Sequence, residues 1–195
     1  SEVEQCGNGV RCVAVMLARR QGSPATLLFD SPAGTVEARI IDTHRAAVNM
    51  GPPKFDDAIQ TLGVGGREFS VSVLSMGNPH CVLDVADVRT ADVAGLGPAI
   101  ERHALFPERC NVGFMQIVDR RSIKLRVFER GAGETLACGT GACAAVASGH
   151  RRGLLDDEVT VQLPGGQLVV SWRGGIAAVW LTGDAELISE GMIDL

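Results

Sequence analysis

The sequence predicts an α+β fold made of two pseudo-twofold-related α/β domains, with mainly antiparallel strands around a central helix in each. Two observations lead to this prediction. A Cys-Gly-x-Gly segment occurs twice, at residues 6–9 and 138–141, each time ahead of a helical pattern. The strand-like stretches are short and follow one another instead of alternating with helices. Two copies of one unit indicate internal symmetry.

The repeat extends without a gap from the Cys-Gly-x-Gly segment to a Pro-x-Gly turn. We interpret each copy as a turn, a helix and a hairpin, and we expect the symmetry to aim both cysteines at one point. The pairs related by the same offset are Cys6 and Cys138, Arg19 and Arg151, Arg20 and Arg152, Pro32 and Pro164, and Gly34 and Gly166.

The first copy contains one helix and several strands. Apolar residues at Val10, Val13, Ala14 and Leu17 give the stripe of an amphipathic helix over residues 9–20. Strands are expected at 26–29, 35–41 and 46–49. The Met-Gly-Pro-Pro run at 50–53 indicates a connector. It divides the remainder of an N-terminal domain, 1–50, from a C-terminal domain, 51–183.

The second part repeats this pattern after a long insertion. Its small residues favour a helix at 141–150 that sits close to a sheet. A second helix is expected around 91–104, interrupted near 95–98. The expected strands are 68–76, 81–85, 112–118, 123–128, 159–163, 167–172 and 177–182.

Composition excludes several classes of protein. The net charge of −5 gives no basic surface for nucleic acid. No apolar run is long enough to span a membrane. The six cysteines form no C-x-x-C pair, so we expect no structural zinc, and reduced thiols in a cytoplasmic protein.

The duplicated cysteines indicate acid–base chemistry. A thiol at a helix N-terminus has a lowered pKa, and the free N–H groups there bind a carboxylate. Two such ends facing each other suit removal of a proton from one face of a carbon and its return to the other. A lone cysteine is more often a buried hydrophobe, and we interpret Cys12, Cys81, Cys110 and Cys143 in that way.

Three further stretches contain candidate site residues. The Gly-rich loop at 128–135 contains Glu129 and Arg130, which could bind an ammonium and a carboxylate, or form only an exposed ion pair. The turn at 77–80 contains Asn78 and His80, and such a turn is often structural alone. Asn111 stands at the start of a strand, where a cap is the plain alternative.

Four segments, at 6–12, 77–80, 109–114 and 129–143, resemble in sequence and order the signature segments of bacterial diaminopimelate epimerases. The resemblance implies interconversion of LL- and meso-diaminopimelate, no cofactor, no metal and a cleft between two domains. It implies that a return strand near 184–195 joins the first domain, and it leaves a homodimer open. The residues it implicates are Cys6 and Cys138 as the catalytic pair, His80 and Glu129 as groups that tune the thiols, Gly7, Asn8, Gly139 and Thr140 around the α-carboxylate, and Asn78, Asn111, Glu129 and Arg130 as substrate contacts.

The chain departs from the family pattern in two ways. The second cysteine has a long lead-in and the first has five residues, so we expect that family substrate-binding positions precede Ser1 and that residues 1–195 alone are weakly active or inactive. The chain also has no Tyr for the family's dimer interface. Two alternatives stay open, a proline or hydroxyproline racemase and a thiol redox or non-catalytic binding protein.

Overall fold

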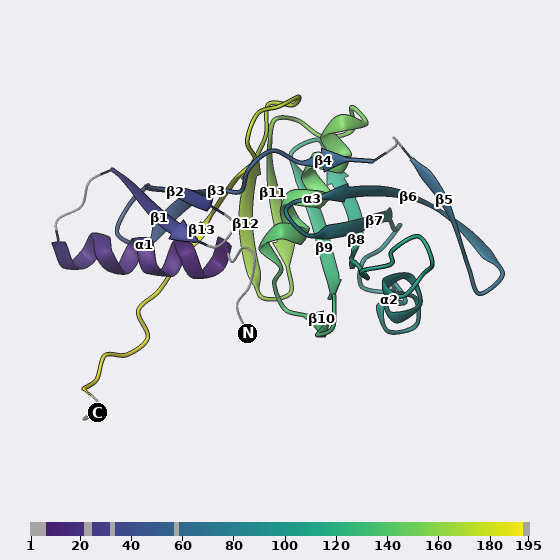
Figure 1. Cartoon of the computed structure of the whole chain (residues 1–195), viewed down its shortest axis with the longest axis horizontal. Helices are drawn as coiled ribbons and strands as arrows, with labels where there is room; N and C mark the ends of the chain where they lie inside the picture. The colour runs from purple at the N-terminus through teal and green to yellow at the C-terminus, as the bar shows by residue number, and fades with distance from the viewer. Residues whose placement is uncertain (1–6, 22–24, 32–33, 57–58, 193–195) are drawn as a thin grey trace.

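The computed structural model describes residues 7–21, 25–31, 34–56 and 59–192 (Figure 1). Within these ranges it contains three helices and thirteen strands. The helices are α1 (Gly7–Gln21), α2 (Val93–Glu101) and α3 (Gly139–Arg151). The strands are β1 (Thr26–Ser31), β2 (Gly34–Ile40), β3 (Arg45–Asn49), β4 (Lys54–Phe55), β5 (Gln60–Val64), β6 (Arg67–Ser75), β7 (Pro79–Asp84), β8 (Asn111–Asp119), β9 (Ser122–Glu129), β10 (Gly133–Thr135), β11 (Glu158–Leu163), β12 (Gly166–Ser171) and β13 (Trp180–Asp184).

The strands form one continuous, mainly antiparallel sheet. Its order is β1-β2-β3-β13-β12-β11-β9-β8-β7-β6-β4, with β10 paired to β9 and β5 paired to β6. Only β9–β11 and β7–β8 pair in parallel. The structure therefore confirms the predicted fold class, with few helices set against many strands.

The sequence repeat reappears in the strand register. In the β1–β2 hairpin, Thr26 pairs with Arg39 and Ser31 with Gly34. In the β11–β12 hairpin, Glu158 pairs with Ser171 and Leu163 with Gly166, at the same offset that relates the two cysteines. The two hairpins are thus copies of one unit, as the repeat predicted.

The two copies meet at the pair β3 and β13. These strands run antiparallel, with Leu181 opposite Val48, and each is followed outward by the hairpin of its own copy. This arrangement places a local pseudo-twofold axis between β3 and β13. Whether the domains divide at residue 50 stays a prediction, since the hydrogen-bonded sheet passes from one part to the other without a break.

The helices differ in how deeply they are buried. In α3, every residue from Thr140 to Gly149 is buried, and the helix contacts strands from β6 to β9 as well as β12 and β13. In contrast, α1 lies against β2, β3 and β13 (Figure 1). Helix α2 covers a second hydrophobic cluster built on β6, β7 and β8. The large main cluster lies around the start of α3 and forms the support for the site.

The prediction of an interruption near residues 95–98 was wrong. Helix α2 is continuous through Pro98, and the Asp92 side chain caps it by accepting a hydrogen bond from Gly95 N at 2.9 Å. A Cβ on Gly97 would lie 2.6 Å from the Phe128 ring, so glycine here allows the helix to pack closely on β9. This packing stabilises a helix that Pro98 weakens by removing one hydrogen bond.

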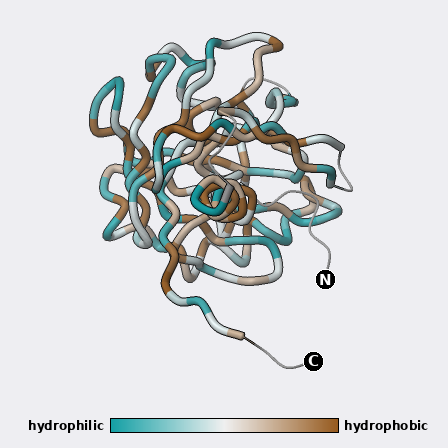
Figure 2. The backbone as a smooth tube through the Cα atoms, turned by 90° about the vertical axis from the view of Figure 1, so that its left-hand side faces the viewer, coloured by the Kyte–Doolittle hydropathy of each residue, from teal (hydrophilic) through white to brown (hydrophobic). Residues whose placement is uncertain are grey.

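The C-terminal part differs from the expected strand positions. The last strand among the described residues is β13 at 180–184, shifted from the expected 177–182. Residues 186–192 are exposed and form neither helix nor strand. Figures 1 and 2 both show this segment leaving the body of the molecule.

Candidate active site

Cys138 is the N-cap residue of α3, and its side chain is nearly buried, at 4% exposure. Its backbone is extended, and its carbonyl accepts the first helical hydrogen bond from Ala142 N at 3.0 Å. The sulfur lies 3.6 Å from Thr140 Oγ1, and the Cys138 side chain makes no capping hydrogen bond to the helix backbone. Cys138 thus stands at the start of α3, where the first backbone N–H groups of the helix have no partner within the helix.

The expected lowering of the thiol pKa was wrong for Cys138. Burial, followed by the negative charge of Glu129 and a hydrogen bond with that carboxylate, raises its pKa to about 12. The Thr140 hydroxyl and the Gly141 N–H act in the opposite direction but are outweighed. At neutral pH Cys138 therefore rests as a thiol, which makes it an acid and not a base.

A chain of hydrogen bonds leads from His80 to the Cys138 sulfur. His80 Nε2 lies 2.9 Å from Asn78 Oδ1, and Asn78 Nδ2 donates to Thr140 Oγ1 at 3.4 Å. Burial, and then the charge of Arg130, lower the His80 pKa to about 3, so the ring is neutral. Asn78 Oδ1 can only accept, so Nε2 donates. The last contact joins Thr140 Oγ1 and the Cys138 sulfur, where either atom can donate while Cys138 is a thiol.

Asn111 links the turn at 77–80 to the turn at 129–132 by two hydrogen bonds. It lies opposite His80 in the parallel β7–β8 register. Its Nδ2 donates to Pro79 O at 3.0 Å, and its Oδ1 accepts from Arg130 N at 3.1 Å. Asn111 is 3% exposed, whereas Arg130 is exposed. The structure thus brings the predicted residues of the second half together around Cys138.

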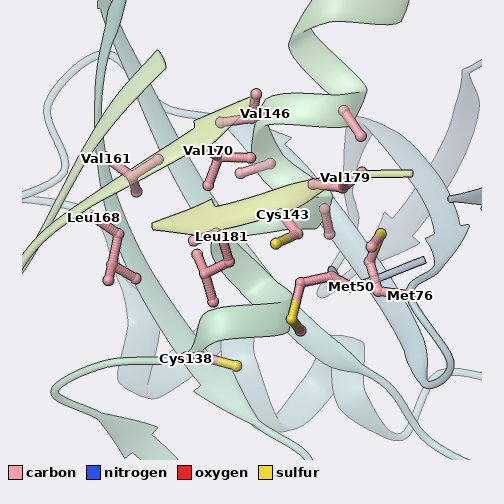
Figure 3. Packing of buried hydrophobic residues seen from close by; sticks show 14 of the residues in the cluster. Met50, Met76, Cys138, Cys143, Val146, Val161, Leu168, Val170, Val179 and Leu181 are labelled. Carbon is pink, nitrogen blue, oxygen red and sulfur yellow. The ribbon is translucent and has the colours of Figure 1, made fainter. Parts of the chain in front are cut away.

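The start of α1 lies directly beside the start of α3. A Cβ on Gly139 would stand 2.9 Å from Leu181 Cδ2 and 3.3 Å from Asn8 Oδ1. A Cβ on Gly7 would stand 2.8 Å from Met50 Sδ and 3.1 Å from the same Leu181 carbon. Figure 3 shows Leu181 and Met50 packed beside Cys138. Both glycines therefore rest on one side chain of β13.

The first member of the predicted cysteine pair, Cys6, lies outside the described residues. The described residue that follows it, Gly7, is the first of α1. The next residue, Asn8, has a buried Oδ1 that accepts no hydrogen bond within the described part of the chain. A pocket of about 200 Å³ opens beside Asn8, Arg11 and Ala137. A buried acceptor without a partner at this junction indicates a place for a ligand donor.

Two residues near the site were missed by the sequence prediction. Thr135 donates from Oγ1 to Glu129 Oε1 at 2.5 Å and so orients the carboxylate next to Cys138. It stands within the Gly-rich loop, so its place in that motif was an available signal. Leu181 underlies both glycines, and no sequence pattern marks it. The described cysteines 12, 81, 110, 138 and 143 form no disulfides.

Two kinds of feature are absent from the described residues. No group of three or more His, Cys, Asp or Glu side chains is arranged to hold a metal ion. None of the three helices is long and apolar enough for a membrane crossing.

Bacterial diaminopimelate epimerases are similar in sequence to the chain over its whole length. It is 50% identical over 208 residues to the diaminopimelate epimerase of Acinetobacter baylyi, covering 100% of this chain and 74% of that protein. It is 49% identical over 210 residues to the diaminopimelate epimerase of Nitrosomonas europaea, covering 100% of this chain and 75% of that one.

Solved structures show the same fold at low identity. A probable proline racemase from Agrobacterium radiobacter superposes with a TM-score of 0.73 at 18% identity, over 97% of this chain and 68% of that one. A hydroxyproline epimerase from Agrobacterium vitis gives a TM-score of 0.70 at 19% identity, over 92% and 63%. A family model described as diaminopimelate epimerase matches residues 72–188. With this match and half of its residues identical to those of a named member, the chain belongs to the diaminopimelate epimerase family, whose activity is that of an isomerase.

Proposed function

We propose that this chain interconverts LL- and meso-diaminopimelate without a cofactor, with one of Cys6 and Cys138 removing the α-proton and the other donating its own proton to the opposite face. The observation that carries the proposal is the meeting of two helix starts, each preceded in sequence by a cysteine, over Leu181. A carbon held at this junction has one thiol-bearing helix on each side. Such an arrangement serves inversion at that carbon.

In the proposed step, the Cys6 thiolate takes the α-proton while the Cys138 thiol gives its proton to the opposite face. The product complex then holds Cys6 as a thiol and Cys138 as a thiolate, so protons and charge balance. The reverse reaction exchanges the two roles. The raised pKa of Cys138 supports its role as the resting acid, since a thiol with a pKa of about 12 keeps its proton at neutral pH.

The Cys138 thiolate that forms in this step needs stabilisation. The Thr140 hydroxyl lies 3.6 Å from the sulfur, and both it and the Gly141 N–H act to lower the Cys138 pKa. Once Cys138 is a thiolate it can only accept, so the Thr140 hydroxyl donates to it, while its oxygen accepts from Asn78 Nδ2. The neutral His80 fixes the Asn78 amide in turn. These donors are already in place before charge appears on sulfur, which is the arrangement that favours its formation.

The substrate α-carboxylate accepts negative charge as the proton leaves. We assign its binding to the backbone N–H groups at the starts of both helices, because helix N-termini bind anions through such groups. The residues at these positions are Gly7, Asn8, Gly139 and Thr140. The buried Asn8 Oδ1 next to Gly139 supports a donor of the substrate, its α-ammonium, at the same place.

The distal end of the substrate has its own amino and carboxylate groups. We assign its carboxylate to Arg130, which is exposed and whose guanidinium matches a carboxylate in geometry. We assign Asn78, Asn111 and Glu129 as further substrate contacts, because the contacts described above link them to Thr140, to Arg130 and to Cys138. The partner is thus a small amino acid and not a nucleic acid.

Reduced cysteines are needed for this chemistry, which favours the cytoplasm as the compartment. A homodimer stays a prediction. A thiol redox protein is a weaker alternative, because the raised pKa of Cys138 makes its thiolate scarce and the thiol slow to attack. Proline racemases share the fold, but Glu129 and Arg130 on β9 and the turn after it favour a substrate with a second charged end.

The experiment is solvent deuterium exchange. LL-diaminopimelate is incubated with the purified protein in D₂O, and deuterium at the α-carbon is followed by mass spectrometry together with formation of the meso isomer. We expect both. Proline in the same assay is expected to remain unlabelled. Labelled proline with unlabelled diaminopimelate would support the racemase, and no label in either would contradict both epimerisation reactions.

A further inference from the structure

Glu101 is a buried carboxylate in an unfavourable position. It is the last residue of α2 and is only 2% exposed. The C-terminal end of a helix carries partial negative charge, and burial of a carboxylate away from water is costly without donors. Glutamate in such a place requires strong compensating contacts, and the nature of these contacts shows what the side chain holds in position.

The shortest of these contacts goes to a backbone amide. Gly131 N donates to Glu101 Oε1 at 2.8 Å. Two guanidinium groups lie farther away, Arg109 Nη1 at 3.9 Å from Oε1 and Arg102 Nε at 3.7 Å from Oε2. Hydrogen bonds from an N–H to a buried carboxylate are stronger than those between neutral groups. Glu101 therefore holds the backbone at residue 131 more firmly than it holds either arginine.

Residue 131 belongs to the turn that contains Glu129 and Arg130. Gly131 has a φ of +75°, a left-handed conformation that glycine adopts at little cost. Three successive amides of this turn have assigned partners: Arg130 N donates to Asn111 Oδ1, Gly131 N to Glu101 Oε1, and Ala132 N to Glu129 O. Two of the three acceptors are buried side chains from other elements.

The Arg130 side chain is held from the same side. Its Nη1 donates to Glu108 O at 3.4 Å, in the loop between α2 and β8. Arg109, next in this loop, has a φ of +60°, which is uncommon for a residue with a side chain. Its guanidinium is one of the two that approach Glu101. The loop and the turn are therefore both tied to the end of α2.

We propose that Glu101 is a positioning residue that fixes the turn at 129–132, so that Arg130 is presented to the distal carboxylate of the substrate. The proposal rests on the proposed function for the identity of the substrate. Glu101 does not touch the reacting atoms. Its contribution is to selectivity for amino acids that carry a second carboxylate, through the hydrogen bond from Gly131 N.

Two substitutions separate the hydrogen bond from the charge. Glu101→Gln keeps the length of the side chain and an oxygen that accepts from Gly131 N, but removes the charge. Glu101→Asp keeps the charge but is too short to reach Gly131 in the same way. Glu68→Ala removes an exposed glutamate from the β5–β6 hairpin and is the control.

The measurement is the KM and kcat of each variant, with hydrogen exchange at the Gly131 amide. We expect Glu101→Asp to raise KM for diaminopimelate about tenfold, the effect of one lost charged hydrogen bond, with kcat within about twofold. Glu101→Gln and Glu68→Ala should match the parent. Exchange at Gly131 should accelerate in Glu101→Asp alone.

The proposal is overturned if Glu101→Gln is impaired and Glu101→Asp is not, because charge would then matter and reach would not. Equal slowing of kcat in both, with unchanged KM, would also overturn it. The exchange measurement needs no substrate, so loss of Gly131 protection in Glu101→Asp tests the contact even if the parent protein fails to epimerise diaminopimelate. Failure of the proposed function would instead appear in the parent protein.

Discussion

Gly139 is packed so closely on Leu181 that a Cβ at position 139 would lie 2.9 Å from the Leu181 Cδ2 methyl. Leu181 is fully buried in the main hydrophobic cluster, so the methyl has little room to move. The absence of a side chain at residue 139 is therefore what allows the start of α3 to approach β13.

Gly139→Ala should displace the start of α3 and lower the epimerisation rate, with a loss of about 1–3 kcal/mol in the free energy of unfolding from overpacking. Leu181→Val shortens the opposing side chain by one carbon. In the double variant it should restore part of the epimerisation rate and part of the free energy of unfolding. Rates and denaturant titrations check this, with Gly63→Ala as control, since a Cβ there meets nothing within 4 Å. Additive losses in the double variant would contradict the clash.

Cys138→Ser should leave the fold intact and reduce epimerisation about a thousandfold, because a hydroxyl is a much weaker acid than a thiol. The measurement is the rate of α-deuteration of diaminopimelate. Cys12→Ser is the control, since Cys12 is exposed and belongs to none of the contacts around Cys138. Near-normal turnover in the Cys138 variant would exclude the two-thiol step.

Thr140→Val should lower kcat about tenfold and change KM little, because it removes a hydroxyl that donates to the Cys138 sulfur when the thiolate forms. Thr140→Ser keeps the hydroxyl and should recover most of the rate. Steady-state kinetics of both variants decide the matter. If the serine variant is as slow as the valine variant, the Thr140 hydroxyl does not account for the stabilisation of the Cys138 thiolate.

His80 should make the protein less stable in mild acid. Its pKa is about 3 in the folded chain against 6.5 in the unfolded one, so between these values the unfolded state binds the extra proton. Stability is therefore lost as pH falls from 6.5 toward 3, by about 2 kcal/mol between pH 7 and pH 5. Urea titrations at the two pH values measure it. His80→Gln, which does not titrate, should show a difference smaller by that amount, and an unchanged difference would contradict the assignment.

Much of the fold was predictable because the repeat and the periodicity are local signals. Residues 9–20 were expected as a helix and α1 spans Gly7–Gln21. The β5 strand was missed, since Gly63 breaks the apolar alternation. Its hairpin nevertheless had a signal in the sequence, the Gly65-Gly66 pair, which is typical of a two-residue hairpin turn. In the structure both glycines take positive φ values, +57° and +76°, between the paired residues Val64 and Arg67. The two-residue β4 and three-residue β10 are too short to show a pattern.

The sequence indicated which residues of the candidate site lie together, but not their electrostatics. The family resemblance selected His80, Asn78 and Thr140, and hydrogen bonds connect these three residues in the structure. The direction of the Cys138 pKa shift was missed, because burial and the nearness of Glu129 depend on how β9 and α3 pack. A helix start recognised in the sequence indicates only the backbone N–H groups that would lower the pKa of the thiol. It does not show the burial or the neighbouring carboxylate that raise it. The roles of these residues and the placement of Cys6 stay predictions.

The position of β13 has a mechanical consequence. This strand is hydrogen-bonded to β3 on one edge and to β12 on the other, and its Leu181 supports both helix starts. Because both glycines pack on the Leu181 side chain, we expect a displacement of Leu181 to move Gly7 and Gly139 together. The distance between the two helix starts, on which the proposed two-sided proton transfer depends, is therefore set by one shared side chain. We expect this distance to change less when the sheet bends than it would if each helix start packed on a separate side chain.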